Sequence, residues 1–269
     1  MKVSVEQVLW QRIISAALGI PLAVGISYAG GNWLRISVGI IILLGLYEYG
    51  SMMRRKGYRP SFGVLLFSGL FIIAAFIYPH LAQALIFIII CTHALGVVFG
   101  KLTIDDISLS LLGVLIVGWT LGHLILVRGS SPQGFYELLL CFLISWSTDT
   151  GAYFSGRFWG RHKLSPLISP NKTVEGAMGG TVLCVIVVFS MQGFLPSVPI
   201  LYLLLVGASA SLAGQVGDLL ESAVKRWAGV KDSGSLIPGH GGILDRFDSL
   251  TLVAPLVYYF LTPFISHLR

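Results

Sequence analysis

Residues 222–248, SAVKRWAGVKDSGSLIPGHGGILDRFD, combine features that seldom occur together in so apolar a chain. They contain the basic pair Lys225-Arg226, a glycine-rich turn around His240, and the acidic positions Asp245 and Asp248, with apolar runs on both sides. Cations and closely approaching backbone N–H groups bind phosphates, and carboxylates hold divalent metals. The segment therefore predicts polyanion chemistry next to a membrane.

The composition excludes a soluble globular protein. Of 269 residues, 55% are hydrophobic and only 11% are charged, and the mean hydropathy is +0.84. So few polar residues cannot cover a globule in water, so lipid must contact much of the surface. The formal net charge of +6 suits anionic lipids or nucleotides, and it also reflects the usual charge bias of membrane loops. The three cysteines stand singly in apolar runs and predict packing, with neither disulfides nor zinc.

Apolar runs of bilayer length predict an all-α integral membrane protein, a polytopic bundle of about nine transmembrane helices. The predicted spans are 12–28, 33–51, 62–78, 81–99, 107–127, 135–156, 174–194, 199–227 and 248–266. No internal repeat is evident, which argues against an inverted-repeat transporter.

The lysines and arginines predict the orientation of this bundle. With nine spans, one side receives nearly all of them, and the other side receives only Arg35, Arg128 and Arg269. Because basic loops stay in the cytoplasm, the N-terminus and a polar cavity formed by the motif loops should face that side.

A second polar stretch, residues 149–176, reads DTGAYFSGRFWGRHKLSPLISPNKTVEG. Asp149 lies inside a predicted span, where a carboxylate is costly without a role. Ser169-Pro170 matches a helix start, which would place Lys172 in the first turn and create a phosphate site. An ordinary capped loop on the basic side of the membrane explains the same residues equally well.

The eighth span has a polar face. Asp218, Glu221, Ser222 and Lys225 are spaced i, i+3, i+4 and i+7, so they share one side of a helix. Asp218 lies roughly 10 Å deeper than Lys225 at about 1.5 Å per residue, which indicates a wet cavity. Asp245 and Asp248 are expected at the start of the ninth helix, where simple capping is the alternative reading.

Three aspartates from two helix ends, Asp218, Asp245 and Asp248, favour a divalent-metal site. Hard oxygen ligands point to Mg²⁺, and the presence of a second cation is left open. The sequence contains no Walker A motif and no nucleotide-binding GxGxxG that follows a strand. In the N-terminal half, Glu48 and the pair Asp105-Asp106 are expected to pair with nearby basic residues at the surface.

The motif residues as a group resemble a known family. Ser222-x-Val224-Lys225-Arg226, Lys231-Asp232-x-Gly234 and the run from Ile237 to Asp248, together with Ser169-Pro170-x-Lys172-Thr173-x-Glu175-Gly176, are similar to the motifs of the phosphatidate cytidylyltransferases (CDP-diacylglycerol synthases). The resemblance implies that CTP and phosphatidic acid give CDP-diacylglycerol and pyrophosphate. It also implies a multi-pass protein of the inner (plasma) membrane with a cytoplasmic active site, and a homodimer; no nucleic-acid partner is expected.

The resemblance also implies roles for individual residues. The expected catalytic residues are Asp218, Asp245, Asp248, Lys225 and His240, and the three aspartates would hold the metal. The expected substrate-binding residues are Lys172, Arg157, Arg226, Lys231, Asp232, Gly239, Gly241, Gly242 and Arg246. Residues 1–130 would then form a scaffold with dimer contacts, and residues 131–269 the catalytic region.

Two kinds of alternative remain open at this point. A CTP-dependent enzyme with another lipid, either an ether-lipid cytidylyltransferase or a polyprenol kinase, would need similar residues. An ion or solute transporter could bury Asp149 and Asp218 as a relay, although the polar residues gather at one end of the spans.

Overall fold

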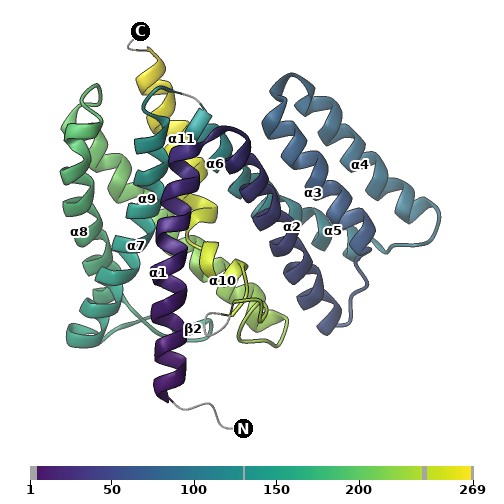
Figure 1. The fold of residues 1–269 in the computed structure, drawn as a ribbon. Coiled ribbons are helices and arrows are strands. Elements are labelled where there is room, and N and C mark those ends of the chain that lie inside the picture. Colours follow the sequence, from purple (N-terminus) through teal and green to yellow (C-terminus); the bar gives the residue numbers. More distant parts are fainter. Residues whose placement is uncertain (1–4, 130, 238–240, 268–269) are drawn as a thin grey trace. The chain divides into compact units, whose positions relative to one another are not determined.

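The computed structural model describes residues 5–129, 131–237 and 241–267 (Figure 1). The chain divides into two compact units. The first unit comprises Met1–Gly122 and Trp227–Phe247, and the second comprises His123–Arg226 and Asp248–Arg269. The signature segment is therefore shared between the two units.

The first unit is helical. Its elements are α1 (Val5–Ala29), α2 (Gly31–Arg55), α3 (Phe62–Ile77), the 3-10 turn η1 (Pro79–Leu81), α4 (Ala82–Val98), α5 (Ile104–Gly113), the π-helix η2 (Val114–Trp119), the start of α6 (Thr120–Gly129) and the short α10 (Leu244–Phe247). Side-chain oxygens cap the N-termini of α3 and α5. Ser61 accepts a hydrogen bond from the N–H of Val64, and Thr103 forms a capping box with Asp106.

Small residues let the helices of this unit approach closely. A methyl group at Gly69 of α3 would lie 2.6 Å from Cδ1 of Leu46 on α2, and one at Gly118 of η2 would lie 2.9 Å from Cγ2 of Ile72. Leu46 and Ile72 are buried at these contacts. Between helices in lipid there is no hydrophobic driving force, so close van der Waals packing of this kind holds them together.

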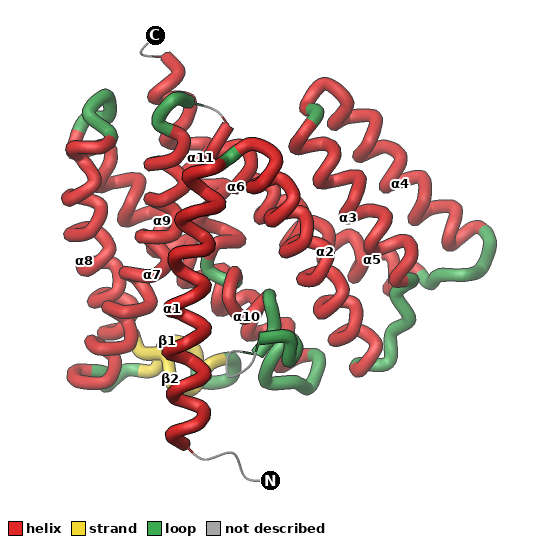
Figure 2. The backbone as a smooth tube through the Cα atoms, in the orientation of Figure 1, coloured by secondary structure: helices red, strands yellow, loops and turns green. Residues whose placement is uncertain are grey.

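The second unit holds α7 (Gly134–Trp159), strands β1 (Lys163–Ser165) and β2 (Ser169–Thr173), α8 (Val174–Ser190), the 3-10 turn η3 (Met191–Phe194), α9 (Ile200–Trp227), whose last residue belongs to the first unit, and α11 (Leu250–His267). The strands form one antiparallel hairpin, in which Lys163 pairs with Thr173 (Figure 2). The backbones of α7 and α8 touch: a methyl group at Gly151 would lie 2.7 Å from the carbonyl oxygen of Gly179.

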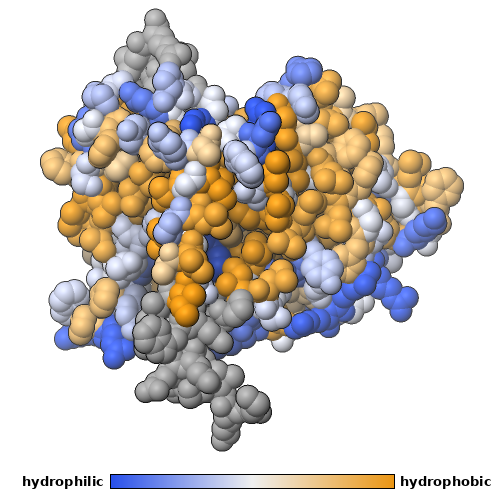
Figure 3. All heavy atoms as spheres, viewed as in Figure 1, coloured by the Kyte–Doolittle hydropathy of each residue, from blue (hydrophilic) through white to orange (hydrophobic). Residues whose placement is uncertain are grey.

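Each predicted span falls on a helical segment of the described chain, so the predicted helical membrane protein is confirmed at that level. Among the described residues, five helices are long and apolar enough to cross a bilayer: Gly31–Arg55, Pro79–Val98, Ile104–Gly129, Val174–Phe194 and Ile200–Trp227. Large apolar side chains are exposed on α4 and α8, including Phe87, Ile90, Val182 and Ile186, and hydrophobic atoms cover much of the face in Figure 3. Lipid contact explains this exposure.

Three local predictions were wrong. The Ser169-Pro170 pair does not begin a helix, because residues 169–173 pair with β1, and Thr173 caps α8 by accepting from the N–H of Gly176 at 3.1 Å. Lys172 therefore lies on a strand, not in the first turn of a helix. The second wrong prediction placed Asp248 at the start of the last long helix, which begins at Leu250 instead.

The third concerns Asp106, for which we expected a basic partner. Its carboxylate instead accepts backbone N–H groups, from Thr103 at 3.1 Å and from Arg59 at 2.9 Å. It caps α5 and fixes the chain that leads into α3.

Candidate functional site

The second unit encloses a cavity of about 570 Å³ between α7, the β-hairpin, α8 and α9. Its wall mixes charged, amide and hydroxyl groups with small residues. The lining residues are Thr148, Asp149, Ala152, Tyr153, Gly156, Arg157, Leu164, Asn171, Lys172, Thr173, Gly176, Ala177, Gln215 and Asp218. This cavity brings the second polar stretch of the sequence, residues 149–176, together with the deep carboxylate of the eighth predicted span.

An ion pair crosses the cavity wall. Nζ of Lys172, on β2, lies 2.5 Å from Oδ2 of Asp218, in the C-terminal half of α9. The contact has the distance of an ion pair without hydrogen-bond geometry, since Lys172 Nζ is buried and has no hydrogen-bond partner among the described residues. A cation and an anion are thus held together where both can be reached from the cavity.

The polar face predicted for α9 is present. Nζ of Lys225 lies 3.1 Å from Oε1 of Glu221, and Oγ of Ser222 donates to Oδ1 of Asp218 at 3.5 Å. Both are i, i+4 contacts, as expected from the spacing. Lys225 and Glu221 are buried, and neither lines the cavity.

Asp248 lies in the turn before α11 and is partly buried. Its Oδ1 accepts the backbone N–H of Ser249 at 2.7 Å. It also faces repulsion from three other carboxylates of the same unit: Asp218, Glu221 and Asp149. Such an accumulation of negative charge is what a bound cation relieves.

A close approach places Asp248 beside α9. A methyl group at Gly217 would lie 2.8 Å from the carbonyl oxygen of Asp248 and 2.9 Å from Oγ1 of Thr251. Only glycine allows the two backbones to come so near. Gly217 is therefore part of what holds Asp218 and Asp248 in one neighbourhood.

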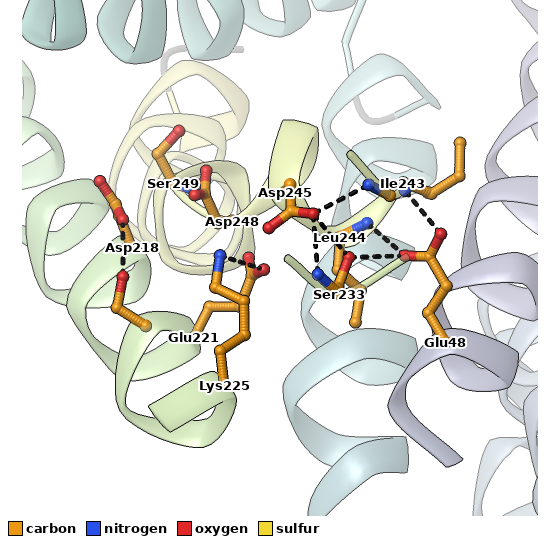
Figure 4. A network of polar contacts seen from close by, with 12 residues as sticks. Glu48, Asp218, Glu221, Lys225, Ser233, Ile243, Leu244, Asp245, Asp248 and Ser249 are labelled. Carbon is orange, nitrogen blue, oxygen red and sulfur yellow. Dashed lines mark hydrogen bonds and ion pairs between the residues drawn. The ribbon is translucent and has the colours of Figure 1, made fainter. Parts of the chain in front are cut away.

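The rest of the signature segment belongs to the first unit and forms a second polar network (Figure 4). Oδ2 of Asp245 accepts hydrogen bonds from the N–H of Ser233 at 2.9 Å and from the N–H of Gly242 at 2.8 Å, and the hydroxyl oxygen of Ser233 lies 3.0 Å away. Gly241 has φ +79°, in the left-handed region that favours glycine. Asp245 and Gly242 thus shape this loop through direct contacts.

Glu48 completes this network, and the sequence analysis missed it. We expected a surface pair with Arg54, Arg55 or Lys101, but the side chain is 3% exposed and accepts hydrogen bonds from the signature segment. A carboxylate within a predicted span was the available signal. No local pattern connects it to residues that lie almost 200 positions later.

The remaining predicted site residues lie in different parts of the two units. Arg157 lines the cavity, and Nε of Arg226 donates to the carbonyl oxygen of Ile168 at 3.3 Å. Lys231, Asp232 and Arg246 are exposed in the first unit. Gly239 and His240 lie outside the described residues.

The predicted metal ligands are divided between the units: Asp218 and Asp248 belong to the second, and Asp245 belongs to the first. Within the described ranges, no group of three or more Asp, Glu, His or Cys side chains is arranged to hold a metal ion. The pair in the second unit supplies hard oxygen donors of the kind that Mg²⁺ takes together with water and phosphate oxygens.

Comparison with known proteins gives a consistent result. The model of the "Cytidylyltransferase family" matches residues 10–264. The chain is similar to the phosphatidate cytidylyltransferase of Synechocystis sp., with 38% identity over 295 residues that cover 96% of this chain and 99% of the relative. It is 37% identical over 257 residues to that of Staphylococcus aureus (strain COL), covering 91% and 96%. A third alignment, to that of Bacillus subtilis (strain 168), is 44% identical over 164 residues and covers 60% and 61%.

Proposed function

This chain belongs to the cytidylyltransferase family and is a nucleotidyltransferase, and from that premise we propose that it transfers the cytidylyl group of CTP to phosphatidic acid. An oxygen of the lipid phosphate attacks the α-phosphorus of CTP. The new oxygen–phosphorus bond gives CDP-diacylglycerol, and pyrophosphate leaves with the electron pair of the broken bond. The similarity over almost the full length of the Synechocystis relative supports this assignment.

The observation that carries the proposal is the Lys172–Asp218 pair in the wall of the cavity. A triphosphate needs cations, and a magnesium ion needs carboxylates; this pair presents one of each side by side. When the substrate binds, Lys172 would pair with a phosphate oxygen and Asp218 would coordinate a cation. The ion pair therefore keeps both groups compensated until the substrate arrives.

Chemistry at this site requires positioning and charge neutralisation more than proton transfer. The phosphate nucleophile is already ionised at neutral pH, so no strong base is needed. Two polyanions must meet, and negative charge moves onto pyrophosphate as it leaves. Lys172 and Arg157 line the cavity and are suited to neutralise this charge. The other basic residues proposed to bind phosphates are Lys225, Arg226, Lys231 and Arg246. The loop residues proposed to contribute to substrate binding are Asp232, Gly239, His240, Gly241 and Gly242.

The residues of the second unit fit a divalent cation. Asp218 and Asp248 would hold Mg²⁺, since their carboxylates repel each other and Glu221 adds to the repulsion. The ion would supply charge neutralisation at the phosphates when bound. Asp245, which belongs to the first unit, is proposed as a third ligand of this ion. Whether a second cation binds is left open.

We also propose the finer topology. Nine spans, a cytoplasmic N-terminus, a location in the inner (plasma) membrane and an active site that opens to the cytoplasm follow from the distribution of lysine and arginine. The homodimer implied by the family resemblance is proposed as well. Sedimentation of the purified protein in detergent tests the dimer.

The decisive experiment incubates purified protein in detergent with Mg²⁺, phosphatidic acid and CTP labelled in its α-phosphate. The proposal expects labelled CDP-diacylglycerol and one pyrophosphate per turnover. Label transfer to an ether lipid alone would indicate a different lipid substrate, and CDP formation with a polyprenol would indicate a kinase. Absence of CTP turnover with all three lipids would overturn the assignment.

A further inference from the structure

We propose that Glu48 is a positioning residue of the reaction: its buried carboxylate holds Ser233 and residues 242–244 of the signature segment, here called the loop, in the conformation that receives the nucleotide. The inference rests on the proposed function for its kinetic part. Its structural part, the attachment of the loop to α2, stands on the contacts of the first unit alone. These contacts are drawn in Figure 4.

The first argument is the set of donors around the carboxylate. Oε2 of Glu48 accepts from the hydroxyl of Ser233 at 2.8 Å and from the N–H of Leu244 at 3.0 Å, and Oε1 accepts from the N–H of Ile243 at 2.9 Å. Glu48 is 3% exposed, and none of the ion pairs among the described residues includes it. A buried carboxylate needs such donors, and the loop supplies all three.

The dependence is mutual. Leu244 is 4% exposed, so without Glu48 its N–H would lose its acceptor at a buried position. Ile243 would lose the acceptor of its N–H in the same way. Backbone donors left buried without a partner are costly, so the loop would have to leave this conformation to satisfy them.

The second argument is steric. A methyl group at Gly234 would lie 2.5 Å from Oε1 of Glu48, and one at Gly242 would overlap both carboxylate oxygens and the hydroxyl of Ser233. Two glycines of the signature thus have a reason that does not involve the nucleotide directly. They let the loop fold tightly around the Glu48 carboxylate.

The third argument connects Glu48 to Asp245. Oγ of Ser233 lies 2.8 Å from Oε2 of Glu48 and 3.0 Å from Oδ2 of Asp245. One hydroxyl carries one proton, so Ser233 donates to only one of the two carboxylates at a time. A change at Glu48 is therefore passed to Asp245, a predicted catalytic residue, through a single side chain.

The test compares Glu48→Gln and Glu48→Ala with the wild type and with Glu137→Gln. Glutamine keeps one acceptor oxygen and loses the other, and alanine loses both. Glu137 is an equally buried glutamate on α7 that accepts from Ser131, which makes it a control for the loss of a buried carboxylate as such. Ser233→Ala is included as a milder variant, so that the test survives if Glu48→Ala does not fold.

Two readouts separate positioning from general stability. A misplaced loop should raise KM for CTP and lower kcat/KM by about tenfold to 100-fold, the scale for a displacement of about 1 Å, while KM for phosphatidate stays unchanged. Hydrogen–deuterium exchange should become faster in peptides that cover residues 241–247. The order of the losses should be Ala, then Gln, then Ser233→Ala, with Glu137→Gln like the wild type.

Two outcomes overturn the inference. One is wild-type kinetics in Glu48→Gln and Glu48→Ala. The other is a fall in kcat alone, with unchanged KM for CTP and unchanged exchange at residues 241–247, which shows that the variants only contain less folded protein. A wild-type protein without turnover would overturn the proposed function instead, and the exchange data would then decide on the attachment of the loop by themselves.

Discussion

Nζ of Lys172 lies 2.5 Å from Oδ2 of Asp218, which links the β-hairpin to the C-terminal half of α9 by an ion pair in the cavity wall. The two side chains are 28% and 26% exposed, so water reaches the pair only in part. An ion pair in such a place leaves an uncompensated charge when one partner is removed. In this pair, Lys172 and Asp218 bind each other, and they are the two groups that would bind a nucleotide phosphate and its metal ion.

We predict that Lys172→Met and Asp218→Asn each lower kcat/KM by roughly 100-fold to 1,000-fold, the scale for losing one electrostatic contact to a transition state. Because the two residues act as a unit, the double variant should lose less than the product of the two single losses. Steady-state kinetics with CTP and phosphatidate measure all three variants.

The matched control is Lys163→Met. This lysine lies on the same hairpin and is exposed, but it is not among the cavity-lining residues. Its replacement should leave kcat/KM unchanged. Fully multiplicative losses in the Lys172 and Asp218 variants would show that the pair does not act as one unit.

A second prediction follows from the carboxylates around Asp248. Burial and the neighbouring carboxylates Asp218 and Glu221 both disfavour the charged form of Asp248, so the neutral amide of Asp248→Asn should make the protein more stable than the wild type without metal. We expect a rise in Tm of roughly 2–4 °C in EDTA, the shift that 1 kcal/mol gives for a chain of this length. The same variant should lose turnover.

Mg²⁺ provides the control for this prediction. The wild type should gain Tm on addition of Mg²⁺, and Asp248→Asn should gain little, because one of the proposed ligands is gone. A variant that melts below the wild type in EDTA would contradict the repulsion argument. An equal response of both proteins to Mg²⁺ would remove Asp248 from the metal site.

A third prediction concerns the contact between α9 and the turn before α11. In Gly217→Ala, the new methyl group meets the carbonyl oxygen of Asp248, a backbone atom that cannot rotate away. Overpacking of this kind costs about 1–3 kcal/mol, and activity should fall because Asp248 is displaced. Gly193→Ala, where nothing lies within 4 Å of the new methyl group, is the control for thermal unfolding in detergent. Equal Tm values for the two variants would contradict the close approach.

Sequence reasoning worked best where the signal was local. Runs of apolar residues located every predicted helical segment, and the i, i+3, i+4, i+7 spacing correctly placed Asp218, Glu221, Ser222 and Lys225 on one helix face. These signals depend only on the bilayer thickness and on the helical repeat. The metal and the clamp residues stay predictions.

Sequence reasoning failed where a distant contact decided the outcome. Ser169-Pro170 satisfies the rules for a helix start, but pairing with β1 made the segment a strand and moved the cap to Thr173. The contact of Glu48 with Ser233 spans 185 positions, and no periodicity connects the two residues. Tertiary pairing of this kind overrides local propensity.

The last prediction tests the topology with single cysteines in a Cys91→Ser background, since Cys141 and Cys184 are buried. Leu167→Cys and Ser235→Cys place thiols in the two motif loops, where both native side chains are exposed, and Gly193→Cys places one in an open turn after α8. Basic loops should lie in the cytoplasm, so a membrane-impermeant maleimide should label the first two only in inside-out vesicles and Gly193→Cys only in intact spheroplasts. A permeant maleimide should label all three from either side, which confirms that each thiol is reactive. Labelling of all three by the impermeant reagent from one side would rule out the nine-span arrangement, because one span, α8, separates residue 167 from residue 193.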